Sequence, residues 1–400
     1  MAEQLGAPSS TLHSVPDIER TLAAIWAGRR RIASARDGGE HHVAARSSVL
    51  NLVVVAGRRE TAERCAATIE ATAGRHPSRS LILSALDVEG PPGLDATVQA
   101  ITVQTAAGSP ETGAETIFVS VYGEAGHHLA SIIVPLLVHD LPVALWWPGD
   151  PDFRSRRADR IVPIADRLIV DGSSWSGDGM DRLADLAAVA RRQRLVVADF
   201  SLLRQTRWRE AVAAVYDLPD LRPHLRSVRS IAVEFATSEE GDPAGLTNIV
   251  RPVYHVAWLA SRLGMTVVEP MKRHPDGRRT ATMGQGNHIV AAEWRPVCSD
   301  LSPGSTVRVQ IASRRRGADL VGEVTAGDLT VEVAVRDQGR ERIRRSYQAP
   351  RLRDVDLLER AVEDDAGDPV AGDTLAMAGH LIAPEPARRS VEKRRSQDDD

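Results

Sequence analysis

Cysteine is nearly absent from this chain of 400 residues, which contains only Cys65 and Cys298. Two cysteines so far apart form neither a disulfide framework nor a zinc-site spacing, and they fit a reducing compartment. Long apolar runs are also missing, because the longest, residues 132–138, is shorter than the ~20 residues that cross a bilayer. The N-terminus lacks the pattern of a signal peptide. We therefore expect a cytoplasmic protein without a membrane partner.

Excess charge of one sign is missing as well. The 50 Lys and Arg residues are nearly balanced by 54 Asp and Glu residues, which leaves a formal net charge of −4. This balance argues against a nucleic-acid partner held by overall basicity. A chain of this length is too long for one ordinary core, so we expect two main domains.

The motifs of common enzymes are absent too. The sequence has no P-loop and no Gly-x-Ser-x-Gly elbow. Gly284 and Gly286 precede an expected strand, so they indicate a hairpin turn and not a dinucleotide loop. Adjacent His41 and His42 point apart and suggest surface residues more than metal ligands. We expect no catalytic set, no metal and no cofactor, and hence a protein that is not an enzyme.

Strands that alternate with helices are present in the first half of the chain. The pattern predicts an α/β fold: a mixed, mostly parallel sheet flanked by helices, followed by a second α+β domain rich in antiparallel strands. The expected helices are residues 15–31, 59–73, 127–139, 181–193, 205–216, 246–263 and 354–363. The expected strands are residues 47–55, 80–86, 97–105, 115–122, 143–147, 167–171, 195–200 and 228–236, with further strands in residues 265–336.

These elements suggest four segments. Residues 1–45 form an N-terminal helix and loop, and residues 46–200 form the α/β domain. Residues 201–350 form the second α+β domain. Residues 351–400 form a C-terminal helix and a charged tail. The tail has few apolar residues, so we expect it to be disordered.

A double tryptophan ends one of the expected strands, in a chain with only 4% aromatic residues. Trp146 and Trp147 are followed by Pro148, Gly149 and Asp150. Because adjacent side chains on a strand point to opposite faces, one ring can enter the core while the other faces a cleft or a partner. The next parallel strand ends in Asp171, so this turn and Asp171 are expected at one sheet edge, where α/β folds bind ligands.

Two further stretches are candidate contact sites. Trp208, Arg209 and Glu210 combine an apolar anchor with charge, as interface centres do, although a buried tryptophan explains them equally well. A basic stretch could face an anion, although a solvated hairpin is an equal alternative. Its cations are Lys272, Arg273, Arg278 and Arg279.

Four separated segments resemble the OpcA family of glucose-6-phosphate dehydrogenase assembly proteins. They are VPLLVHDLPVALWWPGDPDF, ADRLIVDGSSW, DFSLLRQTRWREAVAAVYD and HVAWLASRLGM, which occur in the family's order and spacing. The resemblance covers roughly residues 45–310. In the third segment, only Trp208, Arg209 and Glu210 match the residues that the family has at these positions.

The resemblance implies a non-catalytic protein that assembles with glucose-6-phosphate dehydrogenase, activates it allosterically and so supports NADPH production by the oxidative pentose phosphate pathway. It makes the tryptophan turn and residues 208–210 candidate docking residues. The alternative is a sugar-phosphate-binding enzyme or sensor that uses the crevice at the sheet edge. In that alternative Asp150 and Asp171 hold hydroxyls, while Lys272, Arg273 and Arg278 hold the phosphate.

Overall fold

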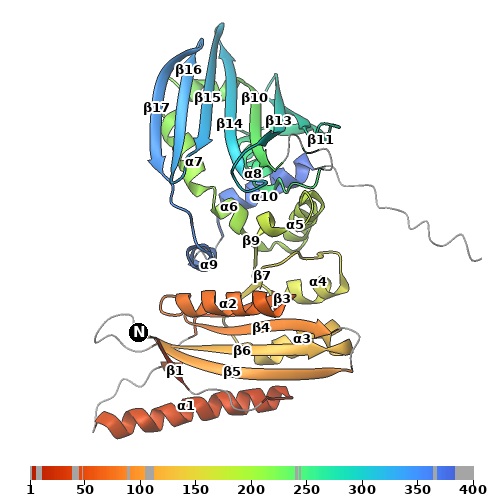
Figure 1. The fold of residues 1–400 in the computed structure, drawn as a ribbon, viewed down its shortest axis with the longest axis vertical. Coiled ribbons are helices and arrows are strands. Elements are labelled where there is room, and N and C mark those ends of the chain that lie inside the picture. Colours follow the sequence, from red (N-terminus) through yellow and green to blue (C-terminus); the bar gives the residue numbers. More distant parts are fainter. Residues whose placement is uncertain are drawn as a thin grey trace, which may run out of the picture.

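The computed structural model describes residues 2–5, 11–37, 45–46, 48–87, 91–103, 112–238, 242, 245–363 and 367–382. Two features that the sequence singled out, His41–His42 and the charged tail at residues 388–400, lie outside these residues. The described part contains two sheets placed one beyond the other along the molecule, with helices between and around them (Figure 1).

The first sheet has nine strands and is mostly parallel. Its order is β1-β5-β6-β4-β3-β7-β8-β9, and β2 pairs with β6. The strands are β1 (Ala2–Leu5), β2 (Ala45–Arg46), β3 (Leu50–Ala56), β4 (Ser78–Asp87), β5 (Gly93–Val103), β6 (Thr112–Tyr122), β7 (Val143–Trp147), β8 (Arg167–Val170) and β9 (Val196–Asp199). Only the pairings of β5 with β1 and β6 are antiparallel. The predicted mixed sheet and the parallel neighbours β7 and β8 are confirmed.

Helices cover both faces of the first sheet, which explains why its central strands have no polar side. All seven residues of β3 are buried. Val53 packs into the core under α1 (Val15–Asp37), α3 (Leu129–Ile133), α4 (Arg156–Ile161) and α5 (Met180–Gln193). Val54 packs on the other face with α2 (Arg59–Thr72) and α9 (Asp354–Glu363). No described helix is long and apolar enough to cross a membrane.

The single helix predicted over residues 127–139 is wrong. The chain forms three short pieces there: η1 (Gly123–His127), α3 and η2 (Val134–Leu136). Pro135 has no backbone N–H to donate, and its ring clashes with the preceding turn, so a regular helix cannot continue through it.

The second sheet has eight strands in the order β11-β12-β13-β10-β14-β15-β16-β17. Its strands are β10 (Val228–Thr237), β11 (Thr266–Arg273), β12 (Arg279–Gln285), β13 (His288–Cys298), β14 (Thr306–Arg315), β15 (Ala318–Ala326), β16 (Thr330–Asp337) and β17 (Arg340–Gln348). Every pairing is antiparallel except that of β10 with β13. The predicted antiparallel second unit is therefore confirmed.

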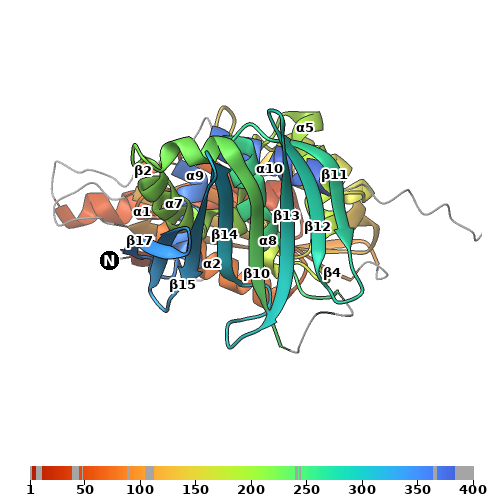
Figure 2. The ribbon, with the colours of Figure 1, turned by 90° about the horizontal axis from the view of Figure 1, so that it is seen from above.

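Only one face of the second sheet carries helices, as the view onto the sheet shows (Figure 2). Helices α7 (Thr206–Tyr216) and α8 (Val250–Arg262) pack beneath it. At Gly322 on β15, a Cβ atom would collide with the hydroxyl of Tyr216 on α7. A side chain at Gly322 would therefore have to displace the Tyr216 ring.

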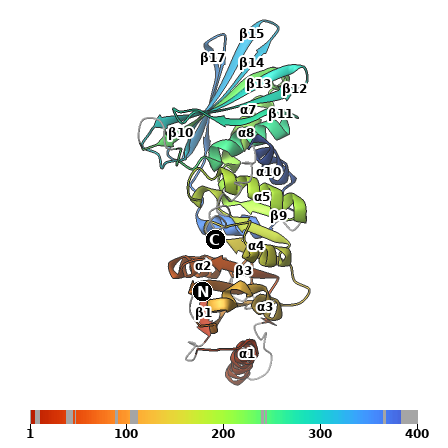
Figure 3. The same ribbon diagram turned by 90° about the vertical axis from the view of Figure 1, so that its right-hand side faces the viewer.

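The last two helices return from the second sheet toward the first (Figure 3). Helix α9 packs on α2, and Arg75 forms an ion pair with Glu359 at 2.6 Å. Helix α10 (Pro369–Leu381) packs against α8 and α5. The sequence patterns predicted α9 but neither α10 nor β17. These C-terminal helices fasten the two sheets together.

Candidate functional site

Two aspartates meet at the carboxyl edge of the first sheet, on the side that faces the second sheet. Parallel pairing of β8 with β9 sets Val170 beside Asp199, so Asp171 follows at the same edge. Ligand crevices of open α/β sheets lie at this edge. The predicted placement of Asp171 is correct, and the structure adds Asp199 as its neighbour.

Asp199 is buried, and both of its carboxylate oxygens accept hydrogen bonds. Oδ1 accepts from the backbone N–H groups of Gly172 at 3.0 Å and Ser201 at 2.7 Å. Oδ2 accepts from the Tyr254 hydroxyl at 2.8 Å, which joins β9 to α8. Burial, reinforced by the negative charge of Asp171, raises the pKa of Asp199 to about 6. A carboxyl group with such a pKa can change its charge near neutral pH.

Asp171 is held in its charged form. Its Oδ1 pairs with Arg204 at 2.8 Å and accepts from the Ser173 hydroxyl at 2.6 Å. Burial alone would raise the pKa of Asp171, but the hydrogen bond and charge of Arg204 hold it below its ordinary value. The two carboxyl groups are thus shifted in opposite directions, a pattern that proton-handling sites share with buried ion-pair networks.

Arg251 lies partly buried beside this pair, and Arg209 lies partly buried on α7. Burial lowers the pKa of Arg251, whose Nη2 donates to Ser173 at 3.1 Å. Burial also lowers the pKa of Arg209. The Nε atoms of both arginines and Oε1 of Gln205 have no hydrogen-bond partner within the described structure. Buried polar atoms without partners are costly, so this cluster has capacity to bind a further polar group.

Sequence reasoning missed Asp199, Arg204, Arg251 and Tyr254. Asp199 carried a usable signal, because the predicted strand at residues 195–200 had to lie parallel to the strand that ends at Asp171. The other three come from helices whose rotation about their axes the sequence does not define.

The expectation that one of the two tryptophans faces outward is wrong. Trp146 is 3% exposed and Trp147 is 8% exposed. Their rings do point to opposite faces: Trp146 packs near Phe200 at a centroid distance of 5.9 Å, and Trp147 near Phe153 at 6.1 Å. Both are buried because helices cover both faces of the sheet at this point.

The turn after the tryptophans reaches the surface. Pro148 and Gly149 are half-buried, and Asp150 is exposed. Asp150 forms an ion pair with Arg182 of α5 and accepts a hydrogen bond from the Ser176 backbone at 3.2 Å. The turn is therefore fixed against the start of α5. It lies at the same sheet edge as Asp171, as predicted, because Trp147 of β7 pairs with Val170 of β8.

The second candidate segment is also mostly covered. Trp208 is half-buried, and its ring lies 4.9 Å from that of buried His255. Arg209 is half-buried, whereas Glu210 is exposed and pairs with Arg207 at 2.7 Å. Only Glu210 of the three presents its side chain freely to solvent.

The basic stretch forms the β11–β12 hairpin, and it is not a uniform cationic surface. Lys272 and Arg273 are exposed, and Lys272 pairs with Glu269 at 3.3 Å. Arg278 pairs with Glu293 at 3.3 Å. Arg279 is only 2% exposed and pairs with Asp178 at 3.0 Å, so its assignment as an anion-facing residue is wrong. Its side chain points inward because β12 alternates faces.

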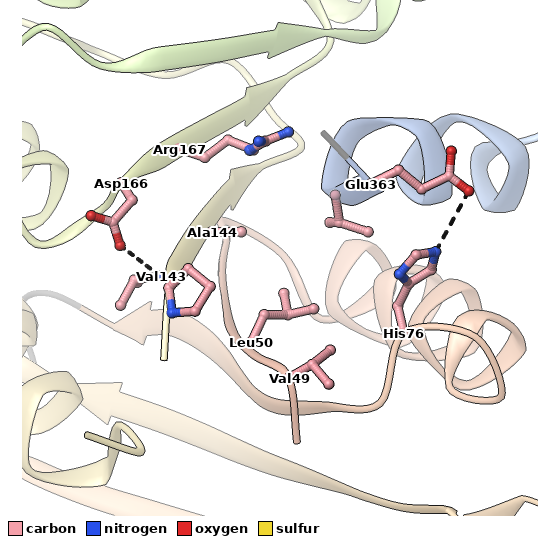
Figure 4. Close-up of a pocket in the computed structure, with 10 residues that line it drawn as sticks. Val49, Leu50, His76, Val143, Ala144, Asp166, Arg167 and Glu363 are labelled. Carbon is pink, nitrogen blue, oxygen red and sulfur yellow. Dashed lines mark hydrogen bonds and ion pairs between the residues drawn. The ribbon is translucent and has the colours of Figure 1, made fainter. Parts of the chain in front are cut away.

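A pocket of about 530 Å³ lies at the opposite, amino edge of the first sheet, between β3, β7, β8 and α9 (Figure 4). His76 faces Glu363 across it at 3.9 Å. Asp166 accepts from the Val143 backbone at 2.8 Å, and Arg167 donates to the Ala361 carbonyl. His76 and Arg167 therefore contact α9, whereas Asp166 joins the start of β8 to β7.

Metal sites and reactive cysteines both place requirements on the described residues. Among them, no three His, Cys, Asp or Glu side chains lie close enough together to hold a metal ion. Cys65 is buried, and burial raises its pKa to about 12, so its thiol stays protonated and unreactive. Cys298 is exposed.

A doubly covered parallel sheet, joined through a buried polar cluster to a sheet with one open face, defines a two-part α/β protein. Two family models together match about three quarters of the chain. Residues 69–191 match the glucose-6-phosphate dehydrogenase subunit N-terminal domain, and residues 195–375 match the C-terminal domain of the same subunit. The chain belongs to the OpcA family.

Two curated relatives are similar over part of the chain. The OxPP cycle protein OpcA of Synechocystis sp. is 27% identical over 145 residues, which is 36% of this chain. The protein of the same name from Synechococcus elongatus is 27% identical over 138 residues, or 34% of this chain. The chain spans 28% of the length of each relative.

The solved structures that resemble this chain are much more distant. The dehydrogenase MviM from Clostridium difficile has a TM-score of 0.39 and 8% identity, covering 83% of this chain and 97% of its own. The super-repressor mutant of Gal80p from Saccharomyces cerevisiae has a TM-score of 0.42 and 10% identity, covering 83% of this chain and 94% of its own.

Proposed function

We propose that this chain is a non-catalytic assembly factor and allosteric activator of glucose-6-phosphate dehydrogenase in the cytoplasm, supporting NADPH production by the oxidative pentose phosphate pathway. The observation that carries the proposal is the match of residues 69–191 and 195–375 to the two domains described for a subunit of that enzyme. The OxPP name of both curated relatives supports the same pathway.

Such a protein acts by differential affinity. It shifts the dehydrogenase toward its active assembly only by as much as it binds that assembly more tightly than the inactive forms. A tenfold preference corresponds to about 1.4 kcal/mol. A rigid binder serves this purpose well, because little ordering cost is then subtracted from the binding energy.

The predicted docking residues divide into two groups. Pro148, Gly149, Asp150 and Glu210 reach the surface and are our candidates for direct contact. Trp146 and Trp147 are buried and hold the turn in position from within the core. Trp208 and Arg209 are half-buried and hold the part of α7 that presents Glu210. We also propose that the domain boundary falls at residues 200–201, close to the division between the two family models.

The test is the rate of the purified cognate dehydrogenase as a function of glucose 6-phosphate concentration, with and without this chain. We expect a lower apparent KM or a higher kcat that saturates as the chain is added. Unchanged kinetics at saturating chain would overturn the proposed activation, and any rate from the chain alone would overturn its non-catalytic role.

The polar cluster of Asp171, Asp199 and Arg251 favours a second candidate, a sugar-phosphate sensor. The unpartnered Nε atom of Arg251 is suited to an anion, and the carboxylates to hydroxyl groups. In that case glucose 6-phosphate alone raises the melting temperature of the chain in proportion to the logarithm of its concentration. No shift at millimolar sugar phosphate would exclude this candidate.

A further inference from the structure

A large groove opens between α5, α10 and the edge strand β11, away from the two aspartates. Its volume is about 1330 Å³. Pockets for small molecules hold ~300–1,000 Å³, so this groove is larger than one metabolite requires. Helices α5 and α10 pack so closely at its base that a Cβ on Gly379 would lie 2.7 Å from that of Ala187.

Most of the accessible lining of the groove is apolar. Val268 is 56% exposed, and Met377 is half-buried. The exposed apolar lining residues include Ala188, Val268, Pro270 and Ala376, whereas Thr266 and His380 are exposed polar ones. A contiguous apolar surface on a charged protein marks an interaction site more often than a chance exposure. Methionine adds a side chain that adapts to the shape of a partner.

The edge of β11 is closed to strand addition. Pro270 offers no backbone N–H, and the register of β11 against β12 shifts twice, after Val267 and after Glu269. Proline and bulges are the devices that keep an edge strand from pairing with another chain. An occupant of this groove therefore contributes side chains, not a β-strand backbone.

One end of the groove is cationic. Arg191 and Arg194 line it at the end of α5, and both are exposed. Neither side chain forms an ion pair or hydrogen bond with another described residue. The only carboxylate among the described lining residues is Asp368, which caps α10 by accepting from Val370 at 2.8 Å. Arginine pairs best with carboxylates, so the charge favours an acidic occupant.

We propose that this α5–α10 groove docks an amphipathic helix of the partner protein, with its apolar face on Val268, Ala376 and Met377 and a carboxylate against Arg191 and Arg194. The proposal rests on the proposed function, which makes the partner the dehydrogenase. A third helix laid between two others buries its apolar stripe without backbone pairing, which is a recurring mode of recognition.

The test compares variants of the full chain in binding to the dehydrogenase, measured by light scattering or titration. Ala376→Arg places a charged side chain in the groove, and Ala24→Arg places the same one on the exposed side of α1, far in sequence from every proposed contact, as a control. We expect Ala376→Arg to weaken binding at least about tenfold and Ala24→Arg to have no effect. Equal melting temperatures will show that both variants fold.

A charge reversal separates the ionic part of the contact. Arg191→Glu should weaken binding several-fold at low salt and less at high salt, whereas Arg192→Glu, outside the groove lining, should not weaken it.

If wild type binds and all groove variants bind equally well, the groove proposal fails while the proposed function stands. If wild type itself does not bind, the proposed function fails. If dodecanoate stabilises wild type but not Ala376→Arg, while binding of the dehydrogenase is unaffected, the groove is a lipid site and the proposal is overturned.

Discussion

The two sheets of this protein are solvated differently. In the first sheet, neighbouring residues Val53 and Val54 point to opposite faces and are exposed by only 1% and 0%. In the second sheet, Val324 is buried under the helices, whereas Val321 on the same strand is half-exposed. The first sheet is thus a structural core, and the second offers a free face.

The free face of the second sheet is covered by ion pairs instead of helices. Arg308 on β14 pairs with Glu234 on β10 and, at 3.5 Å, with Glu323 on β15. Arg336 on β16 reaches Glu323 at 3.4 Å. These ion pairs form a charged row across four strands, so polar and apolar residues alternate along each of them. That alternation predicted the antiparallel second sheet, whereas continuous apolar runs predicted the first sheet, which is covered on both faces.

The largest effect should come from the double tryptophan. Trp147→Ala removes a buried ring from the first sheet and should lower the free energy of unfolding by about 3–5 kcal/mol, because the cavity cannot collapse between two helix-covered faces. Trp208→Ala, from a half-buried position, should cost clearly less. Urea unfolding of both variants measures the difference. Equal losses would contradict the burial that separates them.

The next largest effect concerns Asp199, in the polar cluster between the two sheets. The folded-state pKa of Asp199 is about 6, above the ordinary 3.8, so ionising Asp199 costs stability as pH rises from about 4 to 6. The shift corresponds to about 3 kcal/mol. Asp199→Asn stays neutral and can still bond Gly172, Ser201 and Tyr254. Relative to wild type, it should therefore become more stable between pH 4.5 and pH 7.

Asp171→Asn is the matched control for that prediction. The pKa of Asp171 is lowered by Arg204, so its charge stabilises the fold above its ordinary pKa, and this variant should lose stability at pH 7. Parallel pH profiles for wild type and Asp199→Asn would refute the role assigned to Asp199.

A smaller effect tests the comparison of the sheets directly. Val53→Ala, Val54→Ala and Val324→Ala each remove two buried methyl groups and should cost about 2 kcal/mol. Val321→Ala should cost less than about 1 kcal/mol, because water already reaches it. Chemical denaturation of the four variants checks this. A cost at Val321 equal to the others would mean that the open face is covered in solution.

Periodicity predicted most elements of both sheets, because apolar runs and alternation directly report burial. It failed at residues 127–139, where Pro135 divides the helix, and at α10, whose alanine and glycine residues give no amphipathic pattern. It also missed β17, an exposed edge strand in which four of nine residues are arginines. The local hydrophobic pattern does not indicate an element that is stabilised mainly by contacts with neighbouring elements.

The candidate sites were less predictable than the fold. Sequence reasoning placed one of the two tryptophans and Arg279 at a surface, but the structure buries Trp146, Trp147 and Arg279. Burial of a strand residue depends on whether a distant segment covers that face, and α9, from the far end of the chain, packs in the same buried cluster as Trp146. The α5–α10 groove was inaccessible to sequence analysis for the same reason.

The most direct measurement is the mass of a mixture of this chain with its cognate glucose-6-phosphate dehydrogenase, by size-exclusion chromatography with light scattering. The proposed function predicts one peak that contains both proteins, with a mass equal to an integral combination of the two. Two separate peaks with the masses of the free proteins, at concentrations well above micromolar, would contradict it.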